Sequence, residues 1–153
     1  MSNNLKIAVF GGGSWATAIV KMLCENLNEV GWYMRNQNAI DYILENEHNP
    51  NYLSSAEFDT KKLKLTSNID EMVLYADLLI FAIPSAFIKD ELDKISEKIS
   101  EKIVFSAIKG IVPQSGLIVG EHFNVKDNIP IENIGVITGP CHAEEVAMER
   151  LSY

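Results

Sequence analysis

The chain has 153 residues, the length of one ordinary domain, and a formal net charge of −8. This acidic balance argues against a general affinity for nucleic acid or anionic membranes, although a local basic pocket could still bind a small phosphate ester. Cys24 and Cys141 lie far apart and outside any C-x-x-C pattern, so neither a disulfide framework nor a zinc site is indicated. This cysteine usage fits a reducing cytoplasm best. No apolar run reaches membrane-spanning length and no signal-peptide core follows the polar start, so the protein is expected to be soluble.

The first predicted element is a strand over Lys6–Phe10 that runs directly into three glycines. The stretch Gly11-Gly12-Gly13-Ser14-Trp15-Ala16 fits the dinucleotide fingerprint G-x-G-x-x-A, and apolar residues at helical spacing follow it. In that fingerprint Gly11 permits the tight turn, Gly13 lets the backbone approach a pyrophosphate, and Ala16 allows close packing. Glycines also mark sharp turns that bind nothing, so the rest of the chain has to decide.

Strand and helix patterns alternate along the rest of the chain. Strands are predicted over Glu29–Met34, Leu63–Thr66, Leu78–Ile83, Ile103–Ala107 and Ile134–Thr138. Helices are predicted over Asn36–Glu47, Ile69–Tyr75, from a Ser85 cap to Ile99, over Gly116–Phe123 and over Ala143–Arg150. This alternation predicts one α/β domain, a Rossmann-type doubly wound, mostly parallel sheet with helices on both faces. Charged residues of the helix after Ser85, Glu91 among them, are expected to face water.

Arg35 follows the second predicted strand, where an NAD-preferring site usually has a carboxylate for the ribose 2′-hydroxyl. A guanidinium suits a 2′-phosphate and can stack on adenine, so the position indicates that NADP(H) is accepted. An ordinary solvent-facing arginine at a helix start is the alternative.

Two further strand ends carry candidate residues. Lys109 could neutralise a phosphate or polarise a carbonyl as hydride arrives, or could simply end its strand. The free amides of Gly139-Pro140-Cys141-His142 could bind an anion, or the stretch could be a mere turn. Adjacency of Cys141 and His142 does not make a catalytic pair, and His48, His122 and His142 lack metal-ligand spacing, so no metal is predicted.

Six stretches in family order resemble the N-terminal half of bacterial NAD(P)-dependent glycerol-3-phosphate dehydrogenase. They are Gly11–Ala18, Trp32–Arg35, His48–Leu53, Ala76–Ser85, Lys109–Ile111 and Gly139–Ala147. The resemblance implies reversible reduction of dihydroxyacetone phosphate to sn-glycerol 3-phosphate, which supplies phospholipid synthesis. The oligomeric state of the intact protein stays open, a homodimer included.

The resemblance also implies site residues. The dinucleotide would contact Ser14, Trp15, Arg35, Lys109 and Ala143. Lys109 would touch the substrate too, and Gly139 and Cys141 would line it. The family usually has serine followed by an aromatic residue where this chain has Cys141-His142, and a thiol is the weaker donor.

In the family a helical second domain follows, with the general acid/base lysine. The chain ends at Tyr153 soon after a helix pattern begins, which indicates a truncated protein, so the 153 residues alone are expected to bind cofactor with little or no turnover. A cofactor domain of a hydroxy-acid dehydrogenase and a non-catalytic NAD(P)H-binding module are the alternatives.

Overall fold

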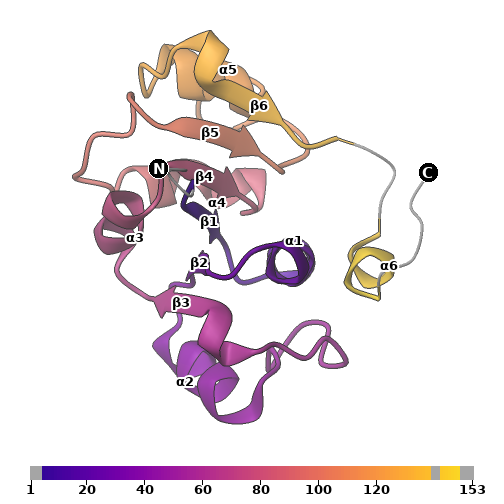
Figure 1. The fold of residues 1–153 in the computed structure, drawn as a ribbon. Helices are drawn as coiled ribbons and strands as arrows, with labels where there is room; N and C mark the ends of the chain where they lie inside the picture. Colours follow the sequence, from indigo (N-terminus) through magenta and orange to yellow (C-terminus); the bar gives the residue numbers. More distant parts are fainter. Residues whose placement is uncertain (1–4, 139–141, 149–153) are drawn as a thin grey trace.

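Six parallel strands form one sheet in the order β3-β2-β1-β4-β5-β6 (Figure 1). The computed structural model describes residues 5–138 and 142–148. The strands are β1 (Ile7–Phe10), β2 (Val30–Tyr33), β3 (Leu63–Thr66), β4 (Leu78–Phe81), β5 (Ile103–Ser106) and β6 (Ile134–Val136). This is the strand order of the doubly wound Rossmann fold, so the predicted fold class is confirmed.

In the described part of the chain, six α-helices connect or follow the strands. They are α1 (Ser14–Asn26), α2 (Gln37–Asn46), α3 (Ile69–Tyr75), α4 (Ser85–Leu92), α5 (Val119–Val125) and α6 (Ala143–Ala147), with short 3-10 helices at Thr60–Lys62 and Ile131–Asn133. Asparagine side chains start two of them, because the Asn36 side chain accepts from the backbone N–H of Asn38 and that of Asn68 from Glu71.

Two apolar cores lie on opposite faces of the sheet, since successive strand residues point to opposite sides. On one face Phe10 and Phe81 stack with ring centroids 4.8 Å apart under α3, α4 and α5. On the other face Val9 and Trp32 pack beneath α1 and α2. Burial on both faces explains the continuous apolar run of β4, in which Leu79, Ile80 and Phe81 are all buried.

The helix after β4 differs from the prediction at both ends. Pro84 occupies its N-cap position without a capping side chain, so the predicted Ser85 cap is wrong; Ser85 is the first helical residue. The helix stops at Leu92 instead of Ile99. Asp70 explains the early end, because its carboxylate accepts from the backbone N–H and hydroxyl of Ser96 and draws the chain into a turn against α3.

The helix predicted over Gly116–Phe123 begins three residues later, as α5. Gly116 has a φ of +70°, which a right-handed helix cannot accommodate. Instead, the backbone N–H of Val112 donates to the carbonyl oxygen of Leu117, and Ile111 and Ile118 form an antiparallel bridge. These bonds hold the segment before α5 as a tight hairpin.

Candidate functional site

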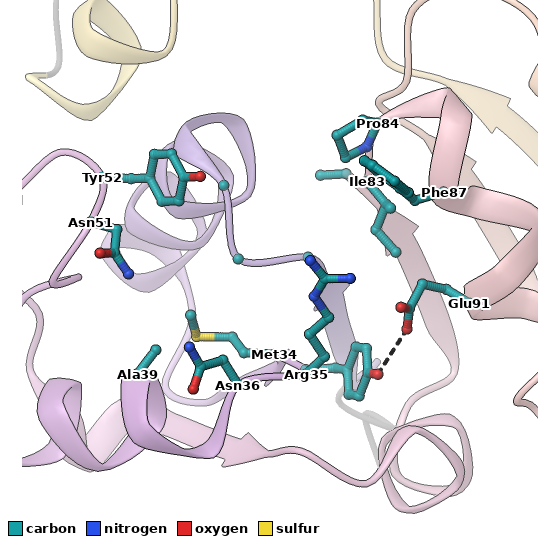
Figure 2. A pocket seen from close by; sticks show the side chains of 15 residues that line it. Met34, Arg35, Asn36, Ala39, Asn51, Tyr52, Ile83, Pro84, Phe87 and Glu91 are labelled. Atoms are coloured by element: carbon teal, nitrogen blue, oxygen red, sulfur yellow. Dashed lines mark hydrogen bonds between the residues drawn. The ribbon is translucent and has the colours of Figure 1, made fainter.

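A pocket of about 340 Å³ opens at the carboxyl ends of β1, β2 and β4. The glycine turn, the residues after β2, residues 51–52 and one side of α4 line it (Figure 2). The strand order reverses between β1 and β4, and doubly wound sheets bind their ligands at that crevice.

The glycine turn at the pocket wall requires its first glycine and leaves space at its third. Gly11 has a φ of +135°, and a Cβ there would lie 2.4 Å from the carbonyl oxygen of Ala82. A Cβ on Gly13 would meet no atom within 4 Å. Gly13 is the N-cap of α1 and has no side chain to cap the helix, so the first-turn N–H groups remain available to an anion.

The carbonyl oxygens of Gly11, Gly12 and Gly13 are each held by a side chain. In that order the donors are Trp32 Nε1 at 2.7 Å, Asn49 Nδ2 at 3.2 Å and Thr17 Oγ1 at 2.9 Å. Anchoring the carbonyls fixes the orientation of the peptide groups. A pyrophosphate would therefore meet a preformed cradle, and the residues present fit a dinucleotide.

Asn49 lies in the stretch His48–Leu53 that resembles the family, but the sequence assigned it no role in this cradle. Its fully buried side chain also donates to Thr17 Oγ1 at 2.9 Å, and its Oδ1 accepts from the backbone N–H groups of Asn51 and Tyr52 at 3.0 and 3.3 Å. One amide thus joins the glycine turn to the loop after α2. The turn-forming residues around Asn49 predicted a loop, and local sequence contains no sign of a partner 37 residues away.

Arg35 lies directly after β2 and lines the pocket, as its place in the sequence suggested. Its side chain is exposed, and Figure 2 shows the guanidinium extending into the space between Tyr52 on one side and Phe87 and Glu91 on the other. The preceding residue, Met34, continues the strand pairing by donating its N–H to the carbonyl oxygen of Thr66 at 3.2 Å. This pairing fixes where the arginine enters the pocket.

Glu91 lines the opposite wall, and the prediction that it faces water is wrong because only 5% of it is exposed. The Tyr33 hydroxyl donates to Glu91 Oε2 at 2.9 Å, and Lys94 Nζ contacts Oε1 at 2.7 Å. Burial, and then the hydrogen bond to Glu91, raise the pKa of Tyr33, which therefore remains a donor. Helical spacing placed Glu91 among charged neighbours, but its contact with Tyr33 of β2 buries it.

Two aromatic side chains border the pocket from opposite sides. Tyr52 and Phe87 line it and are 44% and 50% exposed (Figure 2). Half-exposed rings beside a cavity offer flat surfaces to a planar ligand. The sequence placed one in a loop and the other on an amphipathic helix, and neither position indicated a binding role.

The other predicted cofactor residues lie outside this pocket. Ser14 is the first residue of α1, while Trp15 packs with Ala143 in a small cluster between α1 and α6. Lys109 is exposed in the loop after β5, and a Cβ on the adjacent Gly110 would lie 3.5 Å from Ser85 Oγ. The lysine therefore lies beside the β4–α4 turn, at the same sheet edge as the pocket. Predictions for Gly139 and Cys141 concern positions outside the described residues.

The described residues contain neither a cluster of metal ligands nor a membrane-spanning helix. Across residues 5–138 and 142–148, no group of three or more His, Cys, Asp or Glu side chains could hold a metal ion. In the same part of the chain, each helix is too short or too polar to cross a membrane.

Relatives share this sequence over nearly all of its length. Residues 6–153 match the family model described as NAD-dependent glycerol-3-phosphate dehydrogenase N-terminus. Glycerol-3-phosphate dehydrogenase [NAD(P)+] of Macrococcus caseolyticus is 35% identical over 147 residues, and that of Staphylococcus carnosus is 34% identical over 149. Each alignment covers 95% of this chain and 44% of the relative.

Solved structures share the fold. A glycerol-3-phosphate dehydrogenase of Plasmodium falciparum aligns with a TM-score of 0.85 and 28% identity, over 97% of this chain and 44% of its own. One from Saccharomyces cerevisiae aligns with a TM-score of 0.81 and 23% identity, over 97% of this chain and 45% of its own, which bears on the fold alone. The chain thus spans less than half the length of these relatives. It belongs to the family of NAD-dependent glycerol-3-phosphate dehydrogenase N-terminal domains.

Proposed function

We propose that this chain is the dinucleotide-binding half of an sn-glycerol-3-phosphate dehydrogenase, which interconverts dihydroxyacetone phosphate and sn-glycerol 3-phosphate with NAD(P)H. One observation carries the proposal: in a chain of this family, an anchored glycine turn opens onto a pocket beside Arg35 where the strand order reverses. A nicotinamide cofactor supplies or accepts the hydride in such a reaction.

The chain's own residues would divide the binding work. The α1 N-terminus, with Gly13 and Ser14, would hold the pyrophosphate. Arg35 would stack on the adenine or pair with a 2′-phosphate, so that both NADH and NADPH are accepted. Lys109, at the same sheet edge, would contact cofactor and substrate and favour negative charge on the carbonyl oxygen. Gly139 and Cys141 would line the substrate.

The division of the intact protein follows the same proposal. Residues 1–153 form the cofactor domain, and the general acid/base lysine of the family belongs to a helical second domain. The chain alone would therefore bind the dinucleotide weakly and turn over little or nothing. The intact enzyme would work in the cytoplasm and supply glycerol 3-phosphate to phospholipid synthesis.

Cofactor titration tests the binding role. We expect NADH and NADPH to bind the chain, with nicotinamide fluorescence as the readout. Arg35→Asp should weaken NADPH about tenfold or more and NADH only a few-fold, because the aspartate would repel the 2′-phosphate. Lys61→Asp makes the same change of charge on an exposed residue outside the pocket and should alter neither affinity. Equal losses for both cofactors in Arg35→Asp would refute the role of Arg35.

Steady-state assays test the reaction. A full-length version should oxidise NAD(P)H with dihydroxyacetone phosphate and lose most activity when the substrate lacks its phosphate. Retained activity on hydroxy acids would instead favour the hydroxy-acid dehydrogenase alternative. Rapid turnover by the 153 residues alone would contradict the proposed division of labour, and a full-length protein that binds NAD(P)H without oxidising it would favour a non-catalytic module.

A further inference from the structure

A buried carboxylate shares the pocket with Arg35. Glu91 comes from α4, on the far side of the pocket from β2, and points into the space between them (Figure 2). Glu91 lies three residues before Lys94 in the sequence. It is nearly inaccessible to solvent, because only 6% of its side chain is exposed. Neither the fingerprint nor the position after β2 accounts for a carboxylate here.

Two donors fix this carboxylate in place. The Tyr33 hydroxyl donates a hydrogen bond to Oε2. Lys94 forms an ion pair with Oε1, and half of the lysine side chain is exposed to solvent. Each carboxylate oxygen can accept more than one hydrogen bond, so both oxygens can still accept from a group in the pocket. Tyr33, Arg35 and Glu91 line the same pocket, so the guanidinium and the Tyr33–Glu91 pair face one space.

We propose that Glu91 determines cofactor specificity by disfavouring a 2′-phosphate, so that the site prefers NAD(H) although Arg35 would accept NADP(H). This inference rests on the proposed function, in which the adenosine ribose lies beside Arg35. A phosphate monoester carries about −1.5 to −2 charges at neutral pH, and a fixed carboxylate across the pocket repels it. NADH lacks that group and experiences far less repulsion. A carboxylate from α4 thus replaces the acidic residue that β2 does not provide.

Glu91→Gln tests the proposal because it removes the charge and keeps the shape. The dissociation constants of NADH and NADPH are measured on the 153-residue chain by nicotinamide fluorescence, or by NMR titration into the millimolar range. The ratio of the NADPH constant to the NADH constant should fall about tenfold. Asp90→Asn is the matched control, since it removes one charge from the same helix at an exposed position and should leave the ratio unchanged.

Lys94→Gln tests the same charge from the other direction, and the replaced side chain is itself half exposed. Removing this cation should raise the ratio a few-fold, whereas Lys98→Gln, a change to an exposed lysine nearby, should leave it unchanged. The proposal about Glu91 would be overturned if the ratio stayed constant in both Glu91→Gln and Lys94→Gln, or if both variants lost affinity for the two cofactors equally. Either result would leave the proposed function standing. If the unchanged chain bound neither cofactor, both proposals would fail.

Discussion

The region around β1 and β2 and the region around β5 and β6 differ in how fully their side chains are fixed at the edge of the sheet. Around β1 and β2, the glycine carbonyls are anchored by the side chains of Trp32, Asn49 and Thr17, and all three residues are fully buried. Around β5 and β6, Lys109 is exposed, and Ile111, Ile118 and Val136 are each more than half exposed. The cofactor cradle is therefore held by buried side chains of the chain itself. The region that contains the predicted substrate contact, Lys109, instead has several side chains exposed to solvent.

Gly11→Ala should have the largest effect, because the cradle has no room for a side chain there. The added Cβ would lie 2.4 Å from the Ala82 carbonyl oxygen, and the φ of +135° is costly for alanine. We expect a loss of about 3 to 5 kcal/mol in the free energy of unfolding, measured by urea denaturation.

Gly13→Ala is the companion change that separates binding from stability. Its Cβ meets no protein atom, so stability should change by less than about 1 kcal/mol, while dinucleotide affinity should fall because the methyl group occupies the pyrophosphate space. Equal stability losses in the two variants would show that the turn is not held as tightly as its hydrogen bonds indicate.

Asn49→Ala should have the next largest effect. It deletes four hydrogen bonds made by one buried amide and leaves several partners unsatisfied, which should cost about 2 to 3 kcal/mol of stability and weaken cofactor binding. The control is Asn46→Ala, since this asparagine is exposed and its side chain donates to the carbonyl oxygen of Tyr42 within the same helix, so thermal denaturation should show little change. Similar shifts in the two variants would contradict the bridging role.

Asp127 allows a smaller test on the opposite side, after α5. Burial, and then the charge of Asp93, raise its pKa to about 6, so the folded chain holds the proton more tightly than the unfolded chain. The resulting stabilisation is complete below about pH 4 and is lost as the pH rises through about 6. Asp127→Asn should therefore raise the Tm at pH 7 by about 2 to 4 °C, a figure reduced for solvent screening, with no gain at pH 4.

Two residues near Asp127, His122 and Lys89, also affect the pH dependence of the Tm, so the comparison needs controls for both. His122 Nε2 lies 4.0 Å from Asp127 Oδ2. Burial lowers the pKa of His122, so its contribution to stability increases with pH, opposite to that of Asp127. This contribution is present both in the unchanged protein and in Asp127→Asn. Lys89 lowers the pKa of Asp127, so the salt concentration should be held constant. Asp90→Asn, a charge-matched change on exposed surface, should show no such pH dependence. A gain in Tm that is equal at pH 4 and pH 7 would contradict the raised pKa.

Lys109→Ala should have the smallest effect on stability, less than about 0.5 kcal/mol, because the side chain is exposed. In a full-length version the same change should lower kcat/KM strongly if the lysine contacts substrate. Lys102→Ala offers a structural contrast, since its Nζ donates to the carbonyl oxygen of Ala76 at 2.7 Å and its loss should lower stability without removing catalysis. Full activity of Lys109→Ala would refute its predicted contact.

Local patterns predicted some elements well and failed where a distant partner intervened. The run of α4 read as helical to Ile99, but Asp70, twenty-six residues earlier, accepts from Ser96 and ends the helix at Leu92. The amphipathic pattern likewise predicted that Glu91 of α4 faces solvent, although its hydrogen bond to Tyr33 of β2 keeps it buried beside the pocket. Neither partner is visible in the periodicity of one segment.

The sequence by itself determined the alternation of strands and helices, the glycine turn before α1 and the arginine after β2, because strand and helix periods and the steric freedom of glycine are local properties. Tertiary structure alone decided which side chains complete the pocket. Tyr52 and the buried Asn49, which anchors the glycine turn, come from the loop after α2, whereas Phe87 and Glu91 come from α4. Only the parallel sheet, by bringing the strand ends to one edge, places this loop and this helix around one pocket.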